Sequence, residues 1–187
     1  DMTGHYYLTS FKASGCGLEN IVFIRSYDIE TLDLSNNHLV SLSISSLHDL
    51  KSFNVEGNTR NIGTIYNGEY DLTKLKETAI TADRLSIDRI LEVKGATLDR
   101  ESGKLTNIEG TTVTYVYDTQ NKYVPEAQSV EFTLIIDRNM TVNYEVCTKK
   151  GSDGVYCETW EEVLAAMNDK TKDYYVYLHN DIEVNKL

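Results

Sequence analysis

An apolar pattern that recurs every 21 residues is the feature that most constrains how this chain of 187 residues can fold. Each copy has an apolar residue, two variable residues, an apolar pair spaced two apart, and then a turn; copies begin at Leu8, Ile29 and Leu50. A degenerate fourth copy begins at Leu75, after a longer step of 25 residues. Such a period indicates stacked units, because one unit alone cannot bury its apolar face. We therefore expect stacked repeats over residues 1–85.

Each unit should contain one short strand followed by a turn. Leu32 and Leu34 are two residues apart, so both side chains lie on one face of a strand and point into the core. Asn37 follows at the turn, where its amide can satisfy buried backbone groups, and Cys16 stands there one unit earlier as a small buried residue. The third copy is weaker, because Arg60 stands where an apolar residue should follow. The predicted core contains Leu8, Phe11, Leu32, Leu34, Leu39, Leu42, Phe53 and Val55.

The segment Leu32-Asp33-Leu34-Ser35-Asn36-Asn37-His38-Leu39 resembles the leucine-rich repeat family, and the 21-residue step is similar to that of internalin-like bacterial surface proteins. The resemblance covers about the first 85 residues. It implies a solenoid of three to four repeats with a parallel strand ladder on its concave side. It also implies a secreted protein that is extracellular or on the cell surface. A signal peptide is expected outside the given sequence, because the chain opens without a basic and apolar leader.

The side chains that flank the buried positions of each strand should point outward and form rows on the concave face. Leucine-rich repeat proteins generally bind other proteins on that face, so the resemblance implies a protein partner for these rows. Small polar residues predominate in them, however, and the Trp, Tyr and Arg side chains that usually carry binding energy are absent, which leaves a spacer role open. The candidate partner-binding residues are Ser10, Lys12, Ser14, Thr31, Asp33, Ser35, Ser52, Asn54 and Glu56.

From Ile90 onward the apolar period changes to two, which predicts strands. The alternation runs through residues 113–117, 130–136 and 142–146, and turn residues separate about five strands in all. We therefore expect a small antiparallel β-sandwich-like domain over residues 86–147. It resembles the immunoglobulin-like domains that follow bacterial surface repeats.

The remaining residues, 148–187, predict a short helix and strand segment. Thr159 followed three residues later by Glu162 forms a capping box at the start of the helix. Residues 174–179 read as a strand, and residues 182–184 as a further short strand. The arrangement is similar to the opening rung of bacterial parallel β-helix adhesins, which makes the segment a candidate start of a further domain. The apolar face of the predicted helix comprises Trp160, Val163, Leu164 and Met167.

Charge and composition exclude several classes of partner. The net charge of −11 and the pI near 4.8 disfavour nucleic acid and anionic lipid, because both bind clustered Lys and Arg. No stretch approaches the roughly 20 apolar residues that span a bilayer, so we expect no membrane insertion.

The sequence also lacks the marks of an enzyme. We find no nucleophile beside a base, no phosphate-binding loop and no metal-ligand spacing among the histidines and cysteines, so we expect no catalysis, no metal and no cofactor. Cys147 and Cys157, ten residues apart, leave two alternatives open, a disulfide or buried thiols, and the pattern favours the thiols.

These features predict a non-catalytic protein-interaction or adhesion module, mainly β with short helical pieces. Two alternatives stay open. The chain could be a structural spacer or stalk without a ligand, or an accessory carbohydrate-binding part of a larger glycan-active enzyme.

Overall fold

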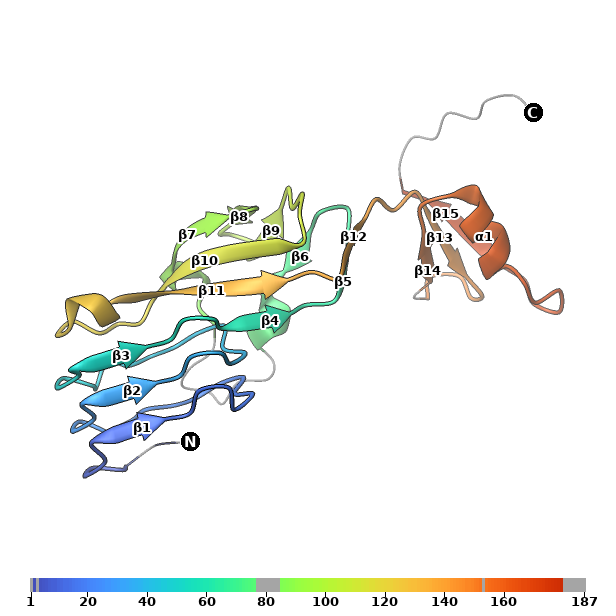
Figure 1. The fold of residues 1–187 in the computed structure, drawn as a ribbon. Helices are drawn as coiled ribbons and strands as arrows, with labels where there is room; N and C mark the ends of the chain where they lie inside the picture. Colours follow the sequence, from blue (N-terminus) through green and yellow to red (C-terminus); the bar gives the residue numbers. More distant parts are fainter. Residues whose placement is uncertain (1, 3, 77–84, 153, 180–187) are drawn as a thin grey trace.

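Short β-strands make up most of the regular structure, as the sequence predicts. The computed structural model describes residues 2, 4–76, 85–152 and 154–179, and within these ranges the chain forms fifteen strands and one α-helix (Figure 1). The fourth predicted copy falls largely outside the described residues, which do not include Thr78, Ile80 and Asp83. Its first residue, Leu75, is buried in a 3₁₀ helix, Leu72–Lys76, rather than in a strand.

Three parallel strands come from the first three copies of the repeated pattern. The strands β1 (Ser10–Lys12), β2 (Thr31–Asp33) and β3 (Ser52–Asn54) form one sheet in that order (Figure 1). Phe11 lies opposite Leu32, and Leu32 lies opposite Phe53, so neighbouring strands are offset by the 21-residue period. The predicted parallel ladder is therefore confirmed over these three copies.

The predicted core is also confirmed, with a gradient of burial. Leu32, Leu34, Leu39 and Leu42 are fully buried, and Val55 is buried with them in one continuous cluster. Leu8, Phe11 and Phe53 are only half-buried and pack against the same cluster. Burial is less complete for Leu8 and Phe11 because they belong to the first unit of the ladder, which has no unit beside it within the described residues.

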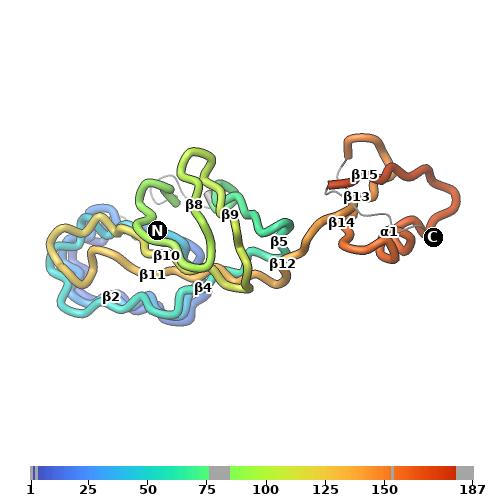
Figure 2. Tube along the Cα trace, turned by 90° about the horizontal axis from the view of Figure 1, so that it is seen from above, coloured from blue at the N-terminus to red at the C-terminus, as the bar shows by residue number. Residues whose placement is uncertain are grey.

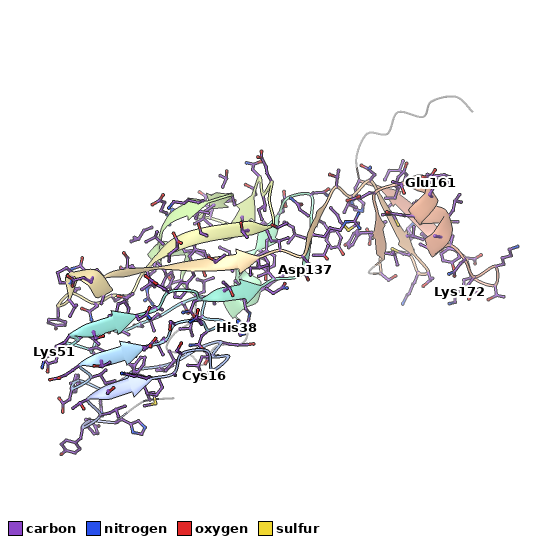
Figure 3. The ribbon with its side chains drawn as sticks, viewed as in Figure 1. Cys16, His38, Lys51, Asp137, Glu161 and Lys172 are labelled. Carbon is purple, nitrogen blue, oxygen red and sulfur yellow. The ribbon has the colours of Figure 1, made fainter. Side chains whose placement is uncertain are left out.

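Buried asparagines hold the turns together. The Asn37 side chain accepts hydrogen bonds from the N–H groups of Cys16 and Leu18, at 2.9 and 3.0 Å, and donates to three backbone carbonyls. Asn58 repeats the arrangement one unit later, accepting from Leu39 N at 3.1 Å. The predicted role of asparagine is confirmed. The prediction that Cys16 is buried is wrong, because its turn lies at the outer edge of the first unit and leaves the thiol exposed (Figure 3).

A second sheet lies beside the ladder and shares its core. It contains β4 (Thr59–Asn61), β11 (Ser129–Ile135), β10 (Thr112–Asp118) and β7 (Ile90–Lys94), in that order. The β10 strand is antiparallel to β11 and to β7, as expected, but β4 joins β11 in parallel. The sheet is mixed because one of its strands comes from the repeat region.

Only one face of this second sheet is buried. Tyr115, Tyr117 and Phe132 point inward and pack in the same cluster as the leucines of the ladder. The hydroxyl of Tyr115 donates to the carbonyl of Val40 at 2.6 Å. Residues on either side of the predicted boundary at residue 85 therefore contribute to one core.

Smaller sheets extend the same body. The strands β5 (Thr64–Tyr66) and β12 (Arg138–Met140) pair in parallel. The strands β6 (Tyr70–Asp71), β9 (Lys104–Thr106) and β8 (Thr97–Asp99) form an antiparallel sheet. Two further 3₁₀ helices, Ile87–Arg89 and Pro125–Ala127, precede β7 and β11.

The C-terminal unit stands apart from the ladder in both views (Figures 1 and 2). Its sheet has the order β14 (Val155–Cys157), β13 (Tyr144–Cys147) and β15 (Tyr175–Leu178), with α1 (Trp160–Ala166) packed on it. The β13 strand, which the sequence analysis placed in the preceding domain, pairs instead with β14 and β15. The predicted strand at 182–184 lies outside the described residues.

The helix begins as predicted, and its apolar face is partly exposed. Thr159 caps it by accepting a hydrogen bond from Glu162 N at 3.3 Å. Val163 is fully buried and Met167 half-buried, whereas Trp160 and Leu164 of the predicted apolar face are about half exposed, at 49% and 56%. The Trp160 ring nevertheless contacts the sheet, since its centroid lies 5.7 Å from that of the Tyr144 ring in β13.

The two C-terminal cysteines are buried thiols. The Cys147 thiol donates to Ser152 O at 3.1 Å, and Cys157 lies opposite Tyr144, three residues from Cys147 along β13. In this register the two sulfurs belong to different rungs of the sheet. Of the two alternatives left open by the sequence, the structure contains the buried thiols, which the pattern favoured, and not the disulfide.

Candidate functional site

The outward side chains of the ladder lie in rows, as the repeat register requires. Past the strand ends the alignment continues, because Ser14 Oγ and Ser35 Oγ are 2.8 Å apart and Asn36 N donates to Glu56 O at 2.9 Å. Eight of the nine predicted partner-binding residues are exposed or half-buried along one side of the ladder, which we call the polar face. Its first two rows are Ser10, Thr31 and Ser52, and then Lys12, Asp33 and Asn54.

Ser35 departs from the prediction, because its side chain is buried at 5% exposure instead of pointing outward. Its hydroxyl donates to Asp33 Oδ1 at 2.7 Å, and its N–H donates to the same oxygen at 3.1 Å. These two hydrogen bonds, with a smaller contribution from the Lys12 ammonium, lower the pKa of Asp33 despite some desolvation. Asp33 is therefore a fixed negative charge on the polar face, and Ser35 positions it.

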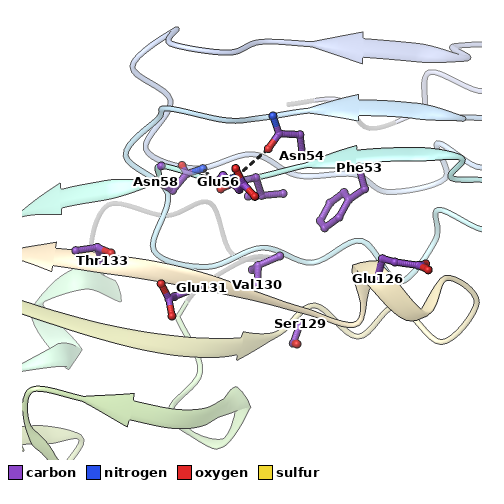
Figure 4. Close-up of a pocket in the computed structure, with 11 residues that line it drawn as sticks. Phe53, Asn54, Glu56, Asn58, Glu126, Ser129, Val130, Glu131 and Thr133 are labelled. Atoms are coloured by element: carbon purple, nitrogen blue, oxygen red, sulfur yellow. Dashed lines mark hydrogen bonds between the residues drawn. The ribbon is translucent and has the colours of Figure 1, made fainter.

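A groove borders the polar face between β3 and the first half of β11. It has a volume of about 580 Å³ (Figure 4). Phe53 and Val55 contribute apolar surface from the ladder side, and Val130 contributes it from β11. The other lining residues are Asn54, Glu56, Gly57, Asn58, Glu126, Ser129, Glu131 and Thr133.

The groove is acidic. Three carboxylates line it, from Glu56 after β3, from Glu126 in the 3₁₀ helix before β11, and from Glu131 in β11. Glu131 has a distant cation, Lys94 Nζ at 3.8 Å. Within the described part of the chain, Glu56 and Glu126 have no salt-bridge partner. The site is thus suited to a cationic ligand that also offers apolar groups.

The sequence predicts the residues on the ladder side of this groove but not those on the β11 side. Asn54 and Glu56 were predicted from the repeat register. Glu126, Ser129 and Glu131 were not, although the alternation of 130–136 already shows that Glu131 points away from the core. The missing information is the pairing of β4 with β11, which sets Thr59 opposite Thr133. Nothing local in either segment specifies that pairing.

A separate aromatic cluster lies on the surface. The His48 ring is 4.2 Å from the Tyr123 ring and 5.6 Å from the Tyr27 ring, measured between centroids. Tyr27 is 42% exposed and Tyr123 58% exposed.

Residues 2, 4–76, 85–152 and 154–179 hold no group of three or more His, Cys, Asp or Glu side chains arranged to bind a metal ion. They contain no helix with the length and apolar character to cross a membrane.

Comparison with known proteins returned no match, whether to protein-family models, to curated proteins or to solved structures.

Proposed function

We propose that this chain is a non-catalytic protein-recognition module of a secreted bacterial surface protein. It binds its partner across the polar face and the adjoining groove. The observation that carries the proposal is the continuity between them, since Asn54 and Glu56 belong to both.

In this proposal the first part of the chain is a short leucine-rich repeat solenoid, and the following strands close its end. The 21-residue strand register and the two buried asparagines, Asn37 and Asn58, support the solenoid. The β4 to β11 pairing supports the closing role, because it covers an end of the stack that would otherwise leave apolar residues in water.

A binding role explains the groove better than a spacer role does. A spacer requires only a stiff body, which the shared core supplies. It does not require the carboxylates of Glu56 and Glu126, which have no salt-bridge partner among the described residues, beside the half-buried ring of Phe53. Aromatic side chains such as Phe53 are the usual anchors of protein interfaces. In this proposal the polar rows align the partner along the ladder, and the groove contributes most of the binding free energy.

The test blocks the polar face without disturbing the fold. The double variant Ser52→Arg with Glu56→Arg adds bulk and positive charge at two exposed positions whose side chains make no hydrogen bond with other described residues. The matched control, Thr148→Arg with Glu101→Arg, makes the same change in charge at exposed positions that belong neither to the polar face nor to the groove. On an array of host-surface proteins, the unaltered chain should capture a partner saturably.

We expect the face variant to weaken that capture at least about tenfold, since it blocks the shared part of face and groove, and the control to leave it unchanged. If both variants lost capture equally, or if the unaltered chain captured no partner saturably, the binding proposal would be refuted in favour of the spacer interpretation.

The aromatic cluster favours a second candidate function, carbohydrate binding. Exposed tyrosines such as Tyr27 and Tyr123 offer flat apolar surfaces against which sugar rings can pack. A glycan array probed with Tyr123→Ala beside the unaltered chain tests it. A glycan signal that is lost in the variant would support this function, and no signal would exclude it.

A further inference from the structure

Within the described residues, the groove separates two stretches of strand edge that have no neighbouring strand. The β3 strand pairs there with β2 on one side only. Leu34 N donates to Asn54 O and Asn36 N donates to Glu56 O, at 2.8 and 2.9 Å, so the even-numbered residues of this segment direct their backbone groups toward β2. Backbone groups alternate along a strand, so those of Phe53 and Val55 face the opposite side, where the groove lies.

The β11 strand shows the same alternation on the other wall. Thr133 N donates to Asn58 O at 3.1 Å, which directs the odd-numbered residues of β11 toward β4. The pairing with β4 starts only at Thr133. Upstream of it, the backbone groups of Ser129 and Glu131 face the groove. Among the described residues the Val55 N–H has no hydrogen-bond acceptor, and the registers turn the N–H groups of Phe53 and Glu131 away from their paired strands, β2 and β10.

Both edges thus present backbone donors and acceptors to the groove that lies between them. Both β3 and β11 run in the same direction, and they diverge from the point where β4 meets β11 (Figures 1 and 4). One residue of a strand fills about 160 Å³, taking ~3.4 Å of rise, ~4.8 Å between strands and ~10 Å of depth. A groove of about 580 Å³ thus has room for roughly three to four residues of strand.

We propose that an extended, basic peptide segment of the partner protein inserts between β3 and β11 as an additional strand. This inference rests on the proposed function and specifies how the partner binds. The inserted backbone pairs with Phe53 and Val55 on one side and with Ser129 and Glu131 on the other. Alternate side chains of the peptide then face the floor and the solvent.

The residues around the groove define the chemistry of that segment. Phe53 projects into the groove from β3 and Val130 from β11, so the inward side chains of the peptide are apolar (Figure 4). Glu56, Glu126 and Glu131 line the same space, so the outward side chains are lysine or arginine. The ligand class is therefore a peptide that alternates basic and apolar residues.

The test uses the full chain and a capped pentapeptide that alternates lysine with valine. Binding is followed by NMR titration, together with hydrogen exchange at the amides of Phe53, Val55 and Glu131. We expect saturable shifts and slower exchange at these three amides. A peptide of the same sequence with two N-methylated amides on one edge should bind about tenfold more weakly, because it lacks two backbone hydrogen bonds.

Charge is tested in the protein. The double variant Glu56→Gln with Glu126→Gln should weaken binding roughly three- to tenfold at low salt, since it removes two carboxylates from the groove. The control Glu101→Gln with Glu161→Gln makes the same change in net charge at exposed sites elsewhere and should have no such effect.

Three outcomes would overturn the inserted strand. They are equal binding of the N-methylated peptide, equal weakening by the control variant, and no protection of the three amides. Each of these leaves the proposed function intact if the Ser52→Arg, Glu56→Arg variant still loses its partner. If that variant keeps its partner as its control does, the proposed function itself fails.

Discussion

Replacing Asn37 with alanine should lower the free energy of unfolding by about 2–3 kcal/mol. The change leaves three backbone groups without a protein partner, the N–H groups of Cys16 and Leu18 and the carbonyl of Ala13. Two other carbonyls that Asn37 contacts keep a second donor. Each lost hydrogen bond contributes roughly 1 kcal/mol, and water at the exposed Cys16 turn offsets part of the loss.

The assay must report on the ladder and not on the C-terminal unit. Tryptophan fluorescence is unsuitable, because the single tryptophan, Trp160, lies in α1. Urea unfolding by far-UV circular dichroism measures stability, and hydrogen exchange at the amides of Cys16 and Leu18 measures the local effect. The control is Asn54→Ala, which replaces an exposed asparagine whose side chain accepts one hydrogen bond from the described residues, from Glu56 N at 3.2 Å.

In Asn37→Ala we expect a lower free energy of unfolding and faster hydrogen exchange at the amides of Cys16 and Leu18. In Asn54→Ala we expect both quantities to stay as in the unaltered chain. If the two variants unfold within about 0.5 kcal/mol of each other, the buried asparagine does not stabilise the turns and the reasoning is refuted.

Three further predictions concern single groups. Hydrogen bonds from the Thr171 side chain and backbone lower the pKa of Asp169 to about 2, so its contribution to stability is present above about pH 3.8 and is lost as the pH falls toward 2. Thr171→Val should raise that pKa in an NMR titration, and an unchanged value would contradict the assignment. Cys16 should react with a thiol reagent in the native protein and the two buried cysteines only after unfolding; three fast thiols would contradict their burial. Tyr115→Phe loses the bond to Val40 O and should cost about 1–2 kcal/mol in urea unfolding, whereas a neutral effect would argue against the shared core.

The ladder could be predicted because its cause is local. The spacing of Leu32, Leu34 and Asn37 fixes one strand and one turn, and repetition at 21 residues fixes the neighbour of that strand. The polar rows follow from the same register. Ser35 escaped prediction because its burial depends on a specific hydrogen bond to Asp33, which alternation alone does not reveal.

The pairings that complete the fold could not be predicted because they join distant segments. Thr59–Asn61 is too short and too polar to show a strand period, yet it pairs with β11 across more than 70 residues. Tyr144–Cys147 continues the alternation of the preceding strands, so periodicity alone assigned it to the wrong sheet. In both cases the sequence shows a strand but not its partner.

The place where the repeat pattern fails is also the place where the groove begins. Arg60 stands where the third copy requires an apolar residue, and its guanidinium forms a salt bridge with Glu19 at 2.9 Å. A charged residue there cannot enter the core of another stacked unit without a large desolvation cost. The chain forms β4 instead, and β4 reaches β11 only from Thr133 onward, so the sheets remain split upstream.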